Sequence, residues 1–207
     1  MRLTSIALAW LELLLLSPCL AGAEPVAGTL SVLRVSVFDE AGVPVDTLAQ
    51  AESEAGRILR QAGIQVVWLH CLQPTPGQIS AAICPQVSFP AHLHLRILRA
   101  SRSAGPSTLG MSFSAANGSG CYSDLFFEPI LELERRGDIS SGIILGHAFA
   151  HELGHLLLGA NSHSGSGLMH ARWDQEDLVQ ARRGTLLFSP AQASKMKSRF
   201  GQGNGQQ

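Results

Sequence analysis

Two histidines and a glutamate lie within five consecutive residues of the sequence, His151-Glu152-Leu153-Gly154-His155. If this segment is helical, His151 and His155 lie one turn apart on the same face, with about 5–6 Å between their Cβ atoms. Two imidazoles on a rigid backbone are suitable ligands for zinc. Glu152 lies beside them, where its carboxylate can accept a proton from water that a metal ion has acidified. The pattern therefore predicts a zinc site with His151 and His155 as ligands and Glu152 as the general base.

The residues around this motif have the composition of a buried helix. Apolar residues occur on every side of the helix predicted at 140–158, which is typical of a central helix that is enclosed by protein. Imidazoles and a carboxyl group are costly to bury there without a partner, and a metal ion would offset that cost. The alternative is a pair of hydrogen-bonded core histidines, with Glu152 directed to solvent. We prefer the metal site.

The chain after this helix contains Gly159, His163 and the tripeptide Gly167-Leu168-Met169. Together with the two histidines before it, this stretch resembles the metzincin metalloproteases, and the matrixins in particular. In that family a Gly ends the zinc helix, a third His completes the zinc site, and a tight turn carries a Met beneath the metal. The resemblance is specific over 146–169 and looser elsewhere. It implies that His163 is the third zinc ligand and that Met169 belongs to a Met-turn.

The spacing departs from the family pattern. Gly159 lies one residue later than the family's Gly, and His163 lies two residues later than its third His. Compared without gaps, Asn161 occupies the ligand position. Neutral imidazole is a better zinc ligand than a carboxamide. We therefore prefer His163, which a longer helix end and a shorter path to Met169 would bring to the metal.

Two other residues are alternatives for the third ligand. Glu176 could serve as a downstream carboxylate ligand in the manner of the gluzincins. His147 lies one turn before His151 on the same helical face, but three histidines along one straight helix diverge from a single tetrahedral centre. We expect three further histidines not to bind the metal: His92, His94 and His170.

The elements that position this motif are predicted from hydrophobic periodicity and from end signals. Strands are predicted at 30–38, 64–69, 91–98 and 121–127, a short edge strand at 111–114, and helices at 45–61, 140–158 and 189–200. The β-α-β opening favours parallel pairing of the first two strands. With the resemblance, these elements predict an α+β fold: a single zincin-like domain in which a mixed, twisted sheet packs on helices, with the zinc-binding helix at its centre.

The first 23 residues have the layout of an export signal. Met1-Arg2 precedes an apolar run at 6–16, and Ala21-Gly22-Ala23 fits the A-x-A cleavage pattern. The alternatives are a lipid anchor at Cys19 and a membrane anchor, although a spanning helix needs about 20 apolar residues. We predict a secreted protein, or a periplasmic one if the source is bacterial, with no membrane association after cleavage. The predicted division of the chain is a signal peptide at 1–23, a domain at 28–200 and a flexible tail at 201–207.

Composition and cysteine count restrict the partners and the compartment. Hydrophobic residues at 45%, charged residues at 15% and a net charge of −1 describe a packed globular protein without a basic surface, so we expect no nucleic-acid partner. We also expect a monomer. Cys71 and Cys84 bracket a segment that contains Pro and Gly, and an exported protein can keep a disulfide, so we predict a bridge between them. Cys121 is expected to be a buried, unreactive thiol.

The resemblance implies a secreted zinc metalloendopeptidase that hydrolyses peptide bonds of a protein or peptide substrate by metal-activated water, with Glu152 as the general base. One alternative is an exported zinc-binding or inactive protease-like protein in which the metal is structural. The intact Glu152 weighs against it, and a structural site is expected to have four protein ligands. Another alternative is a binding module in which the histidines are incidental.

Overall fold

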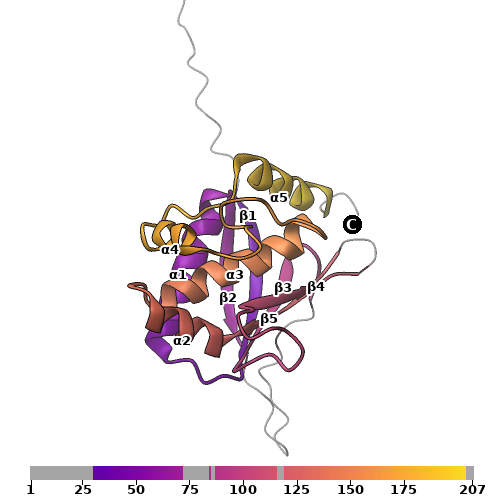
Figure 1. Ribbon diagram of the computed structural model, residues 1–207. Coiled ribbons are helices and arrows are strands. Elements are labelled where there is room, and N and C mark those ends of the chain that lie inside the picture. Colours follow the sequence, from indigo (N-terminus) through magenta and orange to yellow (C-terminus); the bar gives the residue numbers. More distant parts are fainter. Residues whose placement is uncertain (1–29, 72–83, 85–86, 116–118, 204–207) are drawn as a thin grey trace, which may run out of the picture.

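The computed structural model describes residues 30–71, 84, 87–115 and 119–203 (Figure 1). Its elements are β1 (Ser31–Asp39), α1 (Val45–Gln61), β2 (Ile64–His70), β3 (His92–Leu98), β4 (Gly110–Phe113), β5 (Tyr122–Phe126), α2 (Phe127–Arg136), α3 (Ser141–Leu158), α4 (Gln175–Arg182) and α5 (Pro190–Gly203). The signal peptide predicted at 1–23 lies outside the described residues. The predicted tail at 201–207 overlaps α5, which continues past Gly201 to Gly203. Residues 204–207 of that tail also lie outside the described residues.

The strands form one mixed sheet in the order β2-β1-β3-β5-β4. β1 lies between β2 and β3 and is parallel to both, so that Arg34 is opposite Val67 on one side and His92 on the other. β5 continues the parallel pairing on β3, and β4 runs antiparallel to β5 at the edge. The predicted parallel pairing of the first two strands and the predicted edge strand are therefore both confirmed.

The helices cover one face of the sheet. Side chains alternate along a strand, so Leu33, Val35 and Val37 share one face of β1, and each is at most 2% exposed. The buried residues of α1, among them Ile58 and Leu59, belong to the same core. Figure 1 shows α3 running across the strands, and α1 contacts α3 directly. The predicted α+β fold, with helices packed on a mixed sheet, is confirmed.

α3 is the central helix that the sequence predicts. Its first backbone N–H groups are capped by Ser140, whose hydroxyl oxygen accepts a hydrogen bond from the Ile143 N–H at 3.4 Å. Apart from Ile143 and His155, every residue of this helix is buried. A Cβ at Gly146 would lie 2.7 Å from the carbonyl oxygen of Ala51. The absence of that Cβ lets α1 approach α3 closely and fixes the position of α3 over the sheet.

Gly146→Ala is expected to lower the free energy of unfolding, because the new methyl group meets backbone atoms of α1 that cannot move aside. Overpacking of this kind costs about 1–3 kcal/mol. The matched control is Gly56→Ala in α1, where the added Cβ would meet only Trp68 Nε1 at 3.9 Å. Both substitutions gain the same helix propensity. The difference between the two variants in the free energy of unfolding, measured by urea denaturation, therefore isolates the cost of the steric contact. Equal stability of the two variants would contradict the close contact.

The predicted disulfide is present: Cys71, which follows β2, is joined to Cys84. Cys121 has a free thiol that is half-buried, and burial raises the pKa of this thiol. Among the residues that the structure describes, no helix combines the length and the apolar character needed to cross a bilayer.

Candidate metal centre

The three histidines predicted as zinc ligands lie together. His151 and His155 come from α3, and His163 comes from the loop that follows it. Their nearest ring nitrogens all lie within 4.8 Å of one another. Nε2 of His155 is 3.0 Å from Nε2 of His151 and 3.0 Å from Nε2 of His163. Three nitrogen donors thus converge on one point at the C-terminal end of the central helix.

The loop after α3 reverses direction within a few residues and returns His163 to the helix. Gly159 ends the helix with a φ of 89°, and its N–H donates to the carbonyl oxygen of His155 at 2.9 Å. Asn161 has a φ of 57° and is exposed. Asn tolerates this left-handed conformation better than most residues. Asn161 therefore takes part in the turn, and His163 is the residue that lies beside the two helical histidines.

The residues considered as alternative ligands lie elsewhere. Glu176 is exposed at the start of α4 and accepts a hydrogen bond from Gln180. His147 is completely buried, and its Nε2 lies 3.6 Å from Oε1 of Glu54 on α1. Its Nδ1 is 2.9 Å from the carbonyl oxygen of Ile143 in the preceding turn. Neither Glu176 nor His147 belongs to the group of three converging histidines.

The histidines that were expected not to bind the metal are also apart from this group. His92 is hydrogen-bonded to Ser36 at 2.8 Å and stacks edge-on against His94. His170 lies 2.6 Å from a carboxylate oxygen of Asp177. Asp177 in turn completes the capping box of α4 with Asp174. The cluster of His170, Asp174 and Asp177 is therefore explained by the start of a helix.

Outer hydrogen bonds orient the two helical imidazoles. The Nδ1–H of His151 donates to the carbonyl oxygen of Leu168 at 2.7 Å, and Trp173 Nε1–H donates to the same oxygen at 3.2 Å. Nδ1 of His155 is 2.8 Å from the hydroxyl oxygen of Ser162. A proton on Nδ1 leaves the lone pair of Nε2 directed at the converging point. Trp173 and Ser162 were not singled out from the sequence, because their contacts depend on how the loop folds.

Burial keeps both helical imidazoles neutral at pH 7. Loss of solvent, together with the neighbouring His163, lowers the pKa of His151 to about 4 and outweighs the opposite effect of the hydrogen bond to Leu168. The same loss of solvent, together with the proximity of His151 and His163, lowers the pKa of His155 to about 3. Neutral imidazole is the form that binds a metal ion.

Met169, the residue predicted for a Met-turn, lies against α3. It is fully buried, and its backbone oxygen accepts from the Ser164 N–H at 2.9 Å. A Cβ at Gly154 would lie 2.7 Å from Met169 Sδ and 2.7 Å from a ring carbon of Phe188. The lack of a side chain at Gly154, between Glu152 and His155 in the motif, thus leaves room for Met169 and Phe188.

Glu152 is buried against the edge strand β4. Its carboxylate oxygen Oε2 accepts a hydrogen bond from the Ser112 hydroxyl at 2.6 Å, and the residue is 5% exposed. Burial raises the pKa of Glu152 to about 7, and the hydrogen bond from Ser112 acts in the opposite direction. Ser112 is separated from Glu152 by 40 positions, and no local pattern in the sequence indicates this contact.

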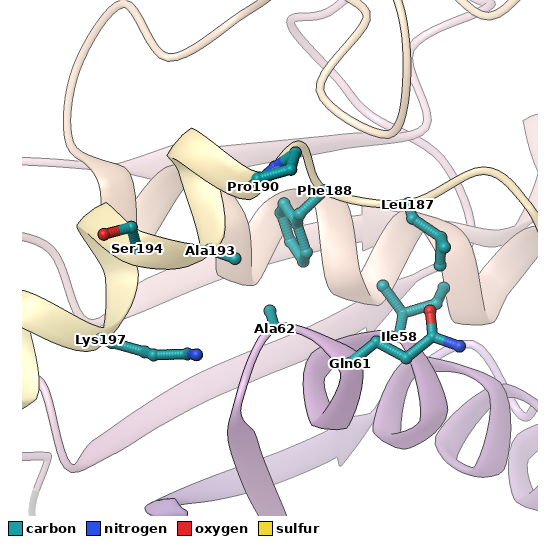
Figure 2. Close-up of a pocket in the computed structure, with 9 residues that line it drawn as sticks. All are labelled: Ile58, Gln61, Ala62, Leu187, Phe188, Pro190, Ala193, Ser194 and Lys197. Carbon is teal, nitrogen blue, oxygen red and sulfur yellow. The ribbon is translucent and has the colours of Figure 1, made fainter. Parts of the chain in front are cut away.

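A separate cavity of about 410 Å³ lies between α1 and α5 (Figure 2). Figure 2 shows Ile58 and Gln61 on α1, Ala62 directly after it, Lys197 on α5, and Phe188 between the two helices. None of the three converging histidines lines this cavity. Phe188, which lines the cavity, also lies against Gly154 of the motif.

Comparisons with known proteins show a similar fold. No family model and no curated protein matches the sequence. The structure is similar to that of a zinc-dependent peptidase from Methanocorpusculum labreanum, with a TM-score of 0.51 and 12% identity over 78% of this chain and 99% of that one. It is also similar to metalloproteinase-II from Bacteroides fragilis, with a TM-score of 0.48 and 15% identity over 82% of this chain and 53% of that one. The chain therefore shares its mixed α+β fold with a zinc-dependent peptidase.

Proposed function

We propose that the chain is a zinc-dependent peptidase whose metal is held by His151, His155 and His163. The observation that carries the proposal is the convergence of three Nε2 atoms, with 3.0 Å separating the Nε2 of His155 from each of the other two. The fold is shared with a protein described as a zinc-dependent peptidase, which supports the assignment. The metzincin resemblance itself stays a prediction.

The donor set fits zinc. Three nitrogens bound to one tetrahedral zinc at about 2.0–2.1 Å lie about 3.3 Å apart, close to the 3.0 Å between these nitrogens. His151 carries its proton on Nδ1, and with the proton of His155 also on Nδ1, as a metal ligand bound through Nε2 requires, the lone pairs of the two Nε2 atoms face each other and repel. A cation between them removes that repulsion. Three nitrogen donors are typical of catalytic zinc sites, where the fourth position is left for water or substrate.

In the proposed reaction these residues hold the metal and move one proton. When bound, zinc acts as a Lewis acid toward water and the scissile carbonyl. Glu152 accepts the proton of the attacking water on its carboxylate and returns it to the leaving amine. The hydrogen bond from His151 to the Leu168 carbonyl and the hydrogen bond between His155 and Ser162 keep the imidazoles in orientation. Met169 shapes the floor of the site without binding the metal.

The alternative function, a zinc-binding or inactive protease-like protein with a structural metal, is less well supported. A structural site usually has four protein ligands, whereas the converging group has three histidines. We further propose a protein or peptide substrate, and secretion after removal of residues 1–23.

The mature protein is expected to contain about one zinc ion per chain and to hydrolyse an unfolded protein such as casein. Removal of zinc with a chelator should abolish hydrolysis, and stoichiometric zinc should restore it, because no other group in the site replaces a Lewis acid. The measurements are elemental analysis and a fluorescent casein assay on the same sample. Substoichiometric metal after zinc addition would contradict the metal site. Full zinc without hydrolysis of any tested protein would favour the structural-metal alternative.

A further inference from the structure

We propose, on the basis of the proposed function, that Ser112 is a positioning residue for Glu152 and that its hydroxyl holds the carboxylate in the orientation needed for proton transfer. Ser112 lies on β4, the antiparallel edge strand. It reaches across to α3, where its Oγ is 2.6 Å from Oε2 of Glu152. This contact joins the edge of the sheet to the general base.

A second hydroxyl extends this hydrogen bond into a chain whose direction is set by the carboxylate, which can only accept when it is ionised. Ser112 lies directly opposite Ser123 of β5 in the strand register, and their Oγ atoms are 2.7 Å apart. Each hydroxyl has one proton to donate. Ser123 donates to Ser112, and Ser112 donates to Glu152. Ser112 Oγ also lies 2.9 Å from the backbone oxygen of Glu152, but the shorter contact, 2.6 Å, is to the carboxylate oxygen Oε2, which is the stronger acceptor when the group is ionised.

Gly110, two residues before Ser112 on β4, lies against the same carboxylate. Residues two apart on a strand share a face, so Gly110 and Ser112 both face α3. A Cβ at Gly110 would lie 2.6 Å from Oε1 of Glu152. The missing Cβ leaves space beside Oε1, while the Ser112 hydroxyl engages Oε2. One oxygen is therefore held by a donor, and the other keeps its lone pairs for the proton that Glu152 moves.

The contact matters because a buried carboxylate with one specific donor has one preferred orientation. Glu152 is 5% exposed, so water has little access to its carboxylate and does not readily replace the Ser112 hydroxyl as a hydrogen-bond donor. A misplacement of about 1 Å at a reacting group can lower a rate by about 10²-fold. Removal of the hydroxyl should therefore reduce turnover without changing how the substrate or the metal binds.

The test compares Ser112→Thr with Ser112→Val. These two side chains have the same shape and differ in a hydroxyl group, so any packing change in the strand is common to both. Ser112→Thr is expected to keep kcat within about 3-fold of the wild-type value, and Ser112→Val to lower kcat by about 10–100-fold, the range for loss of a hydrogen bond to a charged group. KM and zinc content should be the same in both. Ser123→Ala should lower kcat less than Ser112→Val, because Ser112 keeps its own proton.

A second measurement does not depend on activity. The Cδ carboxyl resonance of Glu152, identified in labelled protein by its loss in Glu152→Gln, should stay in place in Ser112→Thr and shift in Ser112→Val. Equal kcat and equal resonances in the Thr and Val variants would overturn the inference. Wild-type protein without hydrolysis would contradict the proposed function alone, and the resonance would still decide whether the Ser112 hydroxyl holds the carboxylate.

Discussion

Glu152→Gln is expected to bind zinc like the wild-type protein and to hydrolyse peptide bonds on the order of 10³-fold more slowly. General acid–base catalysis typically contributes about 10²–10⁴-fold, and an amide cannot take up the proton of the attacking water. Gln matches Glu in size, and its amide oxygen can still accept the hydrogen bond from Ser112. The buried surroundings of position 152 should therefore be preserved. The measurement is kcat on a peptide substrate, with zinc content determined on the same preparation.

Glu128→Gln is the matched control for this prediction. Glu128 is exposed on α2, so the same change of charge there should leave kcat at the wild-type value. Wild-type turnover by Glu152→Gln would show that the assigned base is wrong. Loss of zinc from Glu152→Gln would instead mean that this carboxylate supports the metal or the fold rather than proton transfer.

Hydrophobic periodicity predicted most of the sheet and the central helix. Val35 and Val37 are separated by the polar Ser36, and this alternation identifies β1. The predicted helix at 45–61 has the same bounds as α1. Its end is marked by Gly63, which follows the helix with a φ of 82°. Such signals are local, since each depends on residues within a few positions of one another. That is why the elements could be predicted without knowledge of their packing.

Two helices, α2 and α4, were not predicted from the sequence. The start of α2 has no clear local signal, and α4 has no apolar stripe. α2 begins at Phe127, directly after β5 ends at Phe126, so the apolar residues continue from strand to helix without a turn residue between them. α4 is short, and only Asp177 and Ala181 of its residues are buried. Its sequence signal is the pair Asp174 and Asp177 at capping-box spacing, which could have identified the start of this helix.

The site was predictable in its ligand candidates but not in their supporting contacts. His151, Glu152 and His155 form a pattern within one helix, so their relation follows from helix geometry alone. The contact of Ser112 with Glu152 depends on the sheet order that brings β4 over α3. The hydrogen bond from Trp173 depends likewise on the path of a loop. Tertiary contacts of this kind have no signature in a single sequence.

His163→Ala should weaken zinc binding by more than about 100-fold, although His163 lies two residues later than the third His of the metzincin pattern. Loss of an outer hydrogen-bond partner alone costs about 10–100-fold in metal affinity, and loss of a ligand should cost more. His163 is exposed, so its truncation should leave the core intact. Zinc affinity is measured by competition with a chromophoric chelator, and thermal unfolding of the metal-free protein checks the fold.

Two further variants separate His163 from its rivals. Asn161→Gly should keep the wild-type zinc affinity, because Gly adopts the φ of 57° at this position without strain, whereas Ala would strain the turn. Glu176→Gln should also keep it, since Glu176 is exposed on α4 and bonded to Gln180. A site of the gluzincin type would reverse this result, with zinc lost in Glu176→Gln and retained in His163→Ala. If His163→Ala kept full zinc and activity, the resemblance to metzincins would be limited to the two helical histidines and Glu152, and Met169 would have no role at the metal.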